Sequence, residues 1–167
     1  MSPAFLLVLL AAAASETADA AVLTFNGYGA VHTGMNRAAL DQAGLEVVDY
    51  IPPKGVPGGC IETPLRANRA ILVMWEDGVV TRVTSRDPAT RTRSGVAVGD
   101  SEAKVRAVYG NRLSVEPNKY RYEENWRDLT LFSSDGNHAM VFQTDGERVV
   151  EIHAGQREAA QYVEGCG

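Results

Sequence analysis

Two stretches of the chain alternate between apolar and polar residues and reverse at an Asp-Gly pair. The first runs from Ala70 to Thr84 around Asp77-Gly78, and the second runs from Ala139 to His153 around Asp145-Gly146. Alternation with period two is typical of strands, and Asp-Gly favours a tight hairpin turn. We therefore predict two β-hairpins. Shorter apolar runs predict further strands at Ala21–Phe25, Gly29–His32, Leu113–Val115 and Leu129–Phe132.

Two short helices are predicted, each between a polar cap and a glycine. A polar residue before the first turn and a glycine after the last are the usual helix boundaries. Val105 and Val108 recur at helical spacing and Tyr109 lies beside them, so we expect one face of the second helix to pack against a sheet. The predicted caps are Asn36 for the first helix and Asp100 or Ser101 for the second, and the stops are Gly44 and Gly110.

The helix and the hairpin recur in the same order in both halves of the chain. Matching positions are Gly34 with Gly99, Asn36 with Ser101, Leu40 with Val105, and Ala43 with Val108. Glycine turns and helix caps are common, but a second unit in the same order favours duplication over coincidence. We therefore predict an α+β fold of two tandem repeats, each a short helix packed on an antiparallel β-sheet. The repeats span residues 21–88 and 89–167, the second with a C-terminal tail.

The first twenty residues have the pattern of a signal peptide rather than of a folded element. Phe5–Ala14 is uninterrupted and apolar but too short to span a bilayer. Ala18-Asp19-Ala20 has the small residues of a signal-peptidase site. A buried N-terminal helix is the alternative, which the polar residues after the apolar run disfavour. We expect residues 1–20 to be removed and the mature protein, without a transmembrane segment, to be secreted or periplasmic.

The charge of the chain disfavours one class of partner. The formal net charge is −5, and loss of Glu16 and Asp19 with the signal peptide makes it −3. Nucleic-acid binding relies on clustered Lys and Arg side chains that contact phosphates. We therefore expect no nucleic-acid partner.

The chain has two cysteines, Cys60 and Cys166. In an exported protein, two cysteines most simply form one disulfide bond. The alternative, free or metal-binding thiols, lacks a Cys-x-x-Cys pair and a nearby histidine. A Cys60–Cys166 bond would hold the C-terminal tail against the first half of the chain.

Several motifs resemble those of a family of secreted bacterial proteins without an assigned activity. The motifs are GxGxVxxGM at Gly27–Met35, GVxVGDSEAxVRxxYG at Gly95–Gly110, a hairpin with Thr-Asp-Gly at Val141–Val149, and a terminal Glu-Gly-Cys at Glu164–Cys166. The repeated unit is also similar to the module of β-lactamase inhibitory proteins and of the outer-membrane assembly lipoprotein SmpA/OmlA. Those modules place helices on one face of an antiparallel sheet and bind other proteins. The resemblance implies the same fold and general role, without assigning a binding residue.

The segment around Ser101 also resembles a nucleophile elbow. With His138 or His153 as a base, it would make the protein a small serine hydrolase. Such a site needs a parallel α/β sheet, which this hairpin-rich chain does not predict, so Ser101 is better interpreted as a helix cap. The histidines lack the spacing of metal ligands, and we expect neither a metal nor a cofactor.

Aromatic residues are the best candidates for a binding site. Tyr120, Tyr122 and Trp126 lie in a segment rich in charged residues, whereas Trp75 fits the core of the first hairpin. Exposed aromatic side chains with a polar tip favour recognition of proteins or sugars. We predict a non-enzymatic exported protein that binds another protein or a cell-envelope component. The alternatives are the hydrolase and a purely structural accessory domain.

Overall fold

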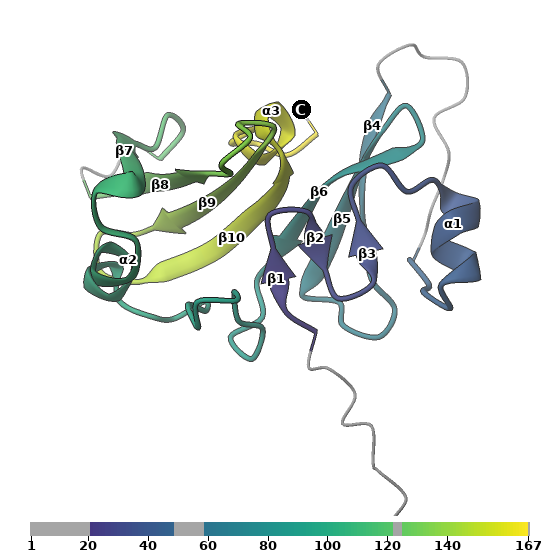
Figure 1. The fold of residues 1–167 in the computed structure, drawn as a ribbon, viewed down its shortest axis with the longest axis horizontal. Coiled ribbons are helices and arrows are strands. Elements are labelled where there is room, and N and C mark those ends of the chain that lie inside the picture. The colour runs from purple at the N-terminus through teal and green to yellow at the C-terminus, as the bar shows by residue number, and fades with distance from the viewer. Residues whose placement is uncertain (1–20, 49–58, 122–124, 167) are drawn as a thin grey trace, which may run out of the picture.

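The computed structural model describes residues 21–48, 59–121 and 125–166 (Figure 1). The expected signal peptide 1–20 and Tyr122 therefore lie outside the described residues. In the described ranges, no helix is long and apolar enough to cross a membrane.

In the described residues ten strands form two sheets, and the larger sheet organises the fold. It is antiparallel throughout, with strand order β4-β5-β6-β10-β9-β8-β7. Its strands are β4 (Cys60–Pro64), β5 (Ile71–Glu76), β6 (Val79–Ser85), β7 (Leu113–Pro117), β8 (Arg127–Phe132), β9 (His138–Thr144) and β10 (Val149–Gln156). The smaller sheet contains β1 (Leu23–Thr24), β2 (Gly27–Tyr28) and β3 (Val31–His32).

The helices are short: α1 (Arg37–Gln42), α2 (Glu102–Tyr109) and α3 (Arg157–Ala160), with one 3-10 turn at Gly110–Arg112. Both predicted caps are confirmed. Asn36 accepts a hydrogen bond from the Ala39 backbone amide at 2.9 Å, and Ser101 accepts one from the Lys104 amide at 3.2 Å. The α+β class is thus confirmed, although most of the regular structure is strand.

The second helix packs through two of the three residues that the sequence indicated. Val105 and Tyr109 are buried, whereas Val108 is 36% exposed. The expectation that Val108 packs against the sheet is therefore wrong. Positions 105 and 109 are four residues apart and lie on the same side of the helix, and Tyr109 is large enough to reach the Phe142 ring at 5.3 Å between centroids.

The strands of both halves join in one continuous sheet, whereas the sequence predicted a sheet for each half. The junction is the antiparallel pair β6–β10, in which Thr84 lies opposite His153. Strands left at the edge of a sheet expose unpaired backbone groups. Pairing β6 with β10 satisfies those groups, and this explains why the two halves share one sheet.

The two faces of this sheet differ in chemistry, because neighbouring residues of a strand point to opposite faces. Val83 of β6 and Ile152 of β10 belong to the hydrophobic core, which also includes Leu40 of α1 and Val105 of α2. Their neighbours in sequence are polar or charged, and they form what we call the polar face.

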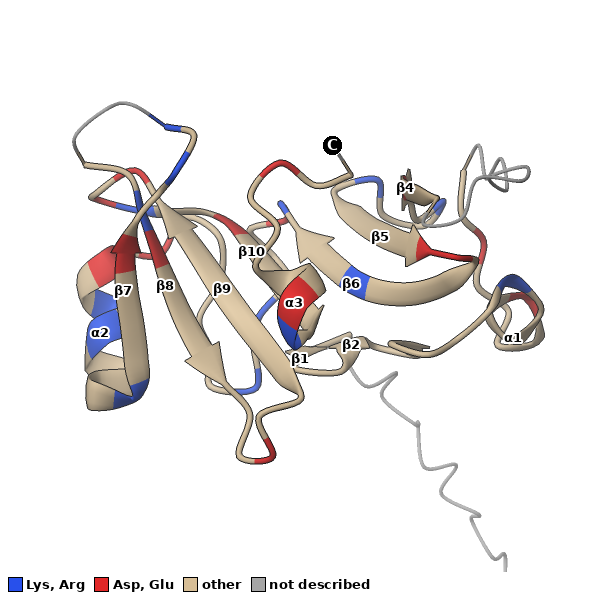
Figure 2. Cartoon of the chain, turned by 90° about the horizontal axis from the view of Figure 1, so that it is seen from above, with Lys and Arg blue, Asp and Glu red and all other residues tan. Residues whose placement is uncertain are grey.

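The acidic segments of β7 and β8 lie side by side, since Glu116 and Asp128 are register partners (Figure 2).

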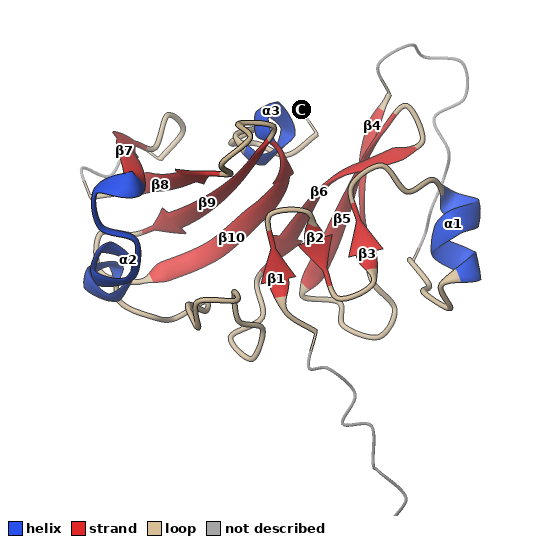
Figure 3. Ribbon diagram, in the orientation of Figure 1, coloured by secondary structure: helices blue, strands red, loops and turns tan. Residues whose placement is uncertain are grey.

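Two kinds of element cover these faces. Helices α1 and α2 lie at opposite ends of the molecule (Figure 3) and pack into the hydrophobic core. Helix α3 and the tail that follows it contact the polar face, because Arg82 of β6 donates hydrogen bonds to the backbone carbonyls of Ala159 and Tyr162. The polar face is therefore partly covered by the C-terminal segment.

Candidate functional site

A hollow of about 470 Å³ opens on the polar face. We call it the polar hollow. Strands β4, β6, β9 and β10 contribute to its lining, together with the loop segment 118–121 and the tail segment 163–165. It therefore lies across the junction of the two halves, where a ligand would contact both.

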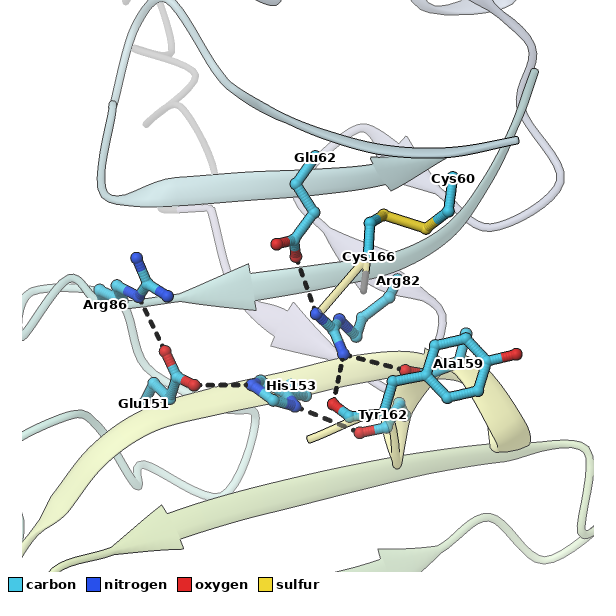
Figure 4. A network of polar contacts seen from close by, with 10 residues as sticks. Cys60, Glu62, Arg82, Arg86, Glu151, His153, Ala159, Tyr162 and Cys166 are labelled. Carbon is cyan, nitrogen blue, oxygen red and sulfur yellow. Dashed lines mark hydrogen bonds and ion pairs between the residues drawn. A yellow bond between two sulfur atoms is a disulfide. The ribbon is translucent and has the colours of Figure 1, made fainter. Parts of the chain in front are cut away.

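Arg82 joins three parts of the chain beneath this hollow (Figure 4). The side chain is only 2% exposed. Its guanidinium donates to the Glu62 carboxylate at 2.8 Å, and to the carbonyls of Ala159 at 3.1 Å and Tyr162 at 2.8 Å. These bonds hold the tail against β4 and β6 and fix one wall of the hollow.

A second polar group surrounds Glu151 of β10 (Figure 4). Its carboxylate accepts from Arg86 Nε at 2.7 Å and lies 3.0 Å from His153 Nε2. His153 Nδ1 lies 3.3 Å from the carbonyl of Ala160, so both ring nitrogens face hydrogen-bond acceptors. Burial acts to raise the pKa of Glu151, but the hydrogen bonds and positive charges of His153 and Arg86 outweigh it and lower this pKa to about 2.

Asn118 shapes the wall that carries Tyr120. Its side-chain oxygen accepts from the backbone amides of Tyr120 and Arg121, both at 3.1 Å, while its Nδ2 donates to Asp128 at 2.9 Å. Burial raises the pKa of Asp128, and the hydrogen bond from Asn118 opposes this effect. Asn118 is itself buried, so the direction of the 118–121 segment is fixed from below.

Several polar groups of the hollow have incomplete hydrogen bonds: Thr84 Oγ1 and Arg82 Nε are buried without a partner among the described residues, and the amide of Gln143 of β9 is a third case. Gln143 is only 5% exposed, yet its side-chain amide has no hydrogen-bond partner within residues 21–48, 59–121 and 125–166. The oxygen and nitrogen of its amide are not among the polar atoms that are completely hidden from solvent. A nearly buried amide without a protein partner is unfavourable, so it is available to a water molecule or a ligand in the hollow.

The predicted aromatic residues have separate positions in the structure. Tyr120 is 51% exposed and lines the polar hollow. Trp126 is half-buried beneath the Arg121 guanidinium, 4.4 Å from the ring centroid, and does not line the described part of the hollow. Tyr122 lies outside the described residues. Trp75 is fully buried, as predicted, and donates from Nε1 to Thr63 at 2.8 Å.

Sequence reasoning found Tyr120 but missed the strand residues of the hollow. Gln143, Glu151 and His153 occupy polar positions of their strands and Arg86 directly follows β6, the ordinary pattern of a face exposed to solvent. The signal that distinguishes them is pairing between strands, which places β6, β9 and β10 side by side. That pairing cannot be deduced from alternation alone.

The predicted disulfide is confirmed: Cys60 and Cys166 are bonded, with their Cα atoms 5.3 Å apart. Ser101 does not meet a histidine among the described residues, since its hydroxyl caps α2. His138 contacts Thr33 at 3.3 Å, and His153 belongs to the group around Glu151. In the same ranges, no group of three or more His, Cys, Asp or Glu is arranged to hold a metal ion.

Comparison with known proteins gave no match to a protein-family model, a curated protein or a solved structure. The expected likeness to secreted bacterial proteins stays a prediction.

Proposed function

We propose that this protein is exported, catalyses no reaction, and uses the polar hollow to bind another protein or a component of the cell envelope. One observation carries the proposal: the half-exposed Tyr120 and the incompletely bonded amide of Gln143 line the same hollow. An exposed aromatic ring provides contact area, and an amide without a protein partner provides a directional hydrogen bond. Together they have the composition of a binding site.

The disulfide supports the part of the proposal that concerns export. Bonds of this kind persist in secreted and periplasmic proteins and are rare in the cytosol. Cys60–Cys166 is buried only in part, so it would be open to reduction inside a cell. The apolar run at Phe5–Ala14 supplies a signal peptide for the same route.

The fixed wall of the hollow favours binding over a purely structural role. Asn118 holds the backbone at Tyr120 and Arg121 in place before any ligand arrives. Such preorganisation reduces the entropy lost on binding. A purely structural domain would gain nothing from an exposed tyrosine and an amide without a protein partner in one hollow. The hydrolase alternative gains no support from Ser101, whose hydroxyl is used by the helix cap.

We also infer that residues 21–88 and 89–167 are tandem repeats. Support comes from matching backbone bonds where each helix meets its hairpin. Gly34 donates to the Val80 carbonyl and Val80 to that of Met35, both at 2.8 Å. In the second half, Gly99 donates to Val149 at 2.8 Å and Val149 to Asp100 at 2.9 Å. Both glycines have positive φ, +88° and +87°, which side chains disfavour.

The strands support the same inference through equivalent irregularities. The β5–β6 pair shifts register after Val80, and the β9–β10 pair shifts after Val149. Four residues beyond each valine lie Thr84 and His153, which pair with each other across β6–β10. Equivalent residues that pair in antiparallel strands relate the halves by a local twofold rotation. The polar hollow lies beside this axis.

The proposed function can be tested with the mature protein, residues 21–167, immobilised and exposed to a detergent extract of the native cell envelope. We expect the wild type to retain a component that Tyr120→Ala retains at least tenfold less. The control is Val108→Ala, since Val108 is also an exposed apolar residue but lies on α2. Equal retention by all three proteins, or none by any, would show that the proposal is wrong.

A further inference from the structure

We propose that the polar hollow binds a neutral saccharide unit. This inference rests on the proposed function, because it names the ligand of the same site. It follows from three properties of the hollow: its charges are paired, its free polar groups both donate and accept hydrogen bonds, and one wall carries an exposed aromatic ring.

The charged residues of the hollow largely neutralise one another. Arg82 is paired with Glu62 at 2.8 Å, and Arg86 with Glu151 at 2.7 Å. Arg121 and Glu164 add one charge of each sign to the lining. A site that selects an anion or a cation presents an excess of the opposite charge. Because this hollow has little excess charge, its chemistry fits a polar but uncharged ligand.

The groups left open in the hollow match hydroxyl groups. The Gln143 amide offers both N–H donors and a carbonyl acceptor. Arg86 uses Nε for Glu151, while its terminal N–H groups have no partner among the described residues. The second carboxylate oxygen of Glu62 likewise accepts no hydrogen bond from the described residues. A hydroxyl donates one hydrogen bond and accepts others, so neighbouring hydroxyls on a sugar ring can meet planar groups of both kinds.

Tyr120 supplies the apolar contact that a sugar ring also needs. The side chain is 51% exposed and lines the hollow, while Asn118 fixes the backbone beneath it. One face of a pyranose ring carries C–H groups, which pack against an aromatic ring. The volume of about 470 Å³ falls within the range of small-molecule sites and is sufficient for one or two sugar units.

The test is an NMR titration of the oxidised mature protein with a panel of neutral saccharides, including N-acetylglucosamine, chitobiose, maltose and cellobiose. The side-chain NH2 signals of Gln143 are assigned by their loss in Gln143→Met. This variant is expected to fold, because the repeats place Met74 at the equivalent position of β5. We expect at least one saccharide to shift the Gln143 side-chain and Tyr120 backbone signals in a saturable manner.

Variants of the hollow test whether the saccharide binds there. Tyr120→Ala is expected to weaken saccharide binding at least tenfold and Gln143→Met at least fivefold, with Val108→Ala within twofold of the wild type. Thermal unfolding checks that each variant is folded. The inference is wrong if no saccharide in the panel shifts these signals, or if the shifts persist in both hollow variants.

A parallel titration with a glutamate-rich peptide and a repeat of the envelope capture after periodate oxidation separate this inference from the proposed function. If Tyr120-dependent capture survives periodate and no saccharide binds, the saccharide inference is overturned but the proposed binding function stands. Capture that is lost in Tyr120→Ala and after periodate would support both. Peptide binding in place of saccharide binding would identify an acidic protein partner and overturn the inference.

Discussion

Cys166 is bonded to Cys60, 106 residues earlier in the chain, and the bond fastens the tail to the edge strand β4. A crosslink over so long a loop removes many conformations of the unfolded chain. We predict that the double variant Cys60→Ala, Cys166→Ala has a free energy of unfolding lower by about 2–5 kcal/mol. Urea unfolding followed by circular dichroism measures the difference. Reductant should destabilise the wild type but leave the double variant unchanged; equal effects on both would contradict the prediction.

The Arg82–Glu62 pair is expected to contribute more to stability than an exposed ion pair. Arg82 is almost fully buried, and Glu62 is its charged partner. Glu62→Gln leaves a buried guanidinium without a carboxylate, and we predict a loss of about 2 kcal/mol in the free energy of unfolding. The matched control is Glu46→Gln, since Glu46 pairs with Arg66 where both side chains are 64% exposed. That change should stay within about 0.5 kcal/mol. Equal losses would show that burial of the pair has no effect.

The predictions that succeeded from sequence depend on neighbouring residues. The Asp77-Gly78 turn, with φ of +51° and +79°, and the caps Asn36 and Ser101 each follow from a few adjacent side chains. The disulfide followed from a count of two cysteines in a chain expected to be exported. Signals of this kind survive in a single sequence because their physical cause is local.

The features that sequence reasoning missed depend on long-range pairing. Thr84 and His153 lie opposite each other although 69 positions separate them, and neither has a local signal of that contact. Strands β2 and β4 are also absent from the sequence prediction, because β2 begins at a glycine and β4 contains Glu62 and ends at Pro64, so neither forms an apolar run. Since the polar hollow is formed by the β6–β10 junction, its strand residues could not be assembled without the structure.

Acid should lower the free energy of unfolding by protonating Glu151. Its pKa in the folded state is about 2, below the ordinary value of 4.5. A carboxyl with a lowered pKa stabilises the fold fully above pH 4.5, and this stabilisation is lost as the pH falls towards 2. The amount is on the order of 3 kcal/mol. Urea unfolding at several pH values should show a steeper loss between pH 4.5 and 2 for the wild type than for Glu151→Gln. The control Glu147→Gln, in the exposed β9–β10 turn, should retain the wild-type slope.

The two helix caps provide a comparison between the halves. Ser101→Ala and Asn36→Ala each remove a hydrogen bond to a backbone amide of the first turn. We predict that each variant lowers the free energy of unfolding by about 1 kcal/mol. Ser101→Gly should lower the free energy of unfolding by only a few tenths of about 1 kcal/mol, because glycine is tolerated at the cap. Thermal unfolding monitored by circular dichroism tests this order, and an unchanged midpoint for Ser101→Ala would contradict the cap assignment.

Gly155 of β10 is the position where a single methyl group should do most damage to the sheet. A Cβ atom there would lie 2.2 Å from the Thr81 carbonyl oxygen and 2.7 Å from the Arg82 Cα atom, both in the backbone of β6. Backbone atoms cannot move aside as a flexible side chain can. Gly155→Ala must therefore separate the two strands that join the halves. We predict a loss of about 3 kcal/mol or more in the free energy of unfolding.

The control for this clash is Gly95→Ala. Gly95 has a φ of +82°, but a Cβ atom there would meet nothing within 4 Å. Gly95→Ala should lower the free energy of unfolding by about 1 kcal/mol, from backbone strain alone. Hydrogen exchange by NMR gives the second readout, since Gly155→Ala should expose the amides of β6 and β10 before those of β8. Equal unfolding midpoints for the two alanine variants would show that β6 and β10 do not approach as closely as described, and that the junction of the halves is not where the sheet is most sensitive.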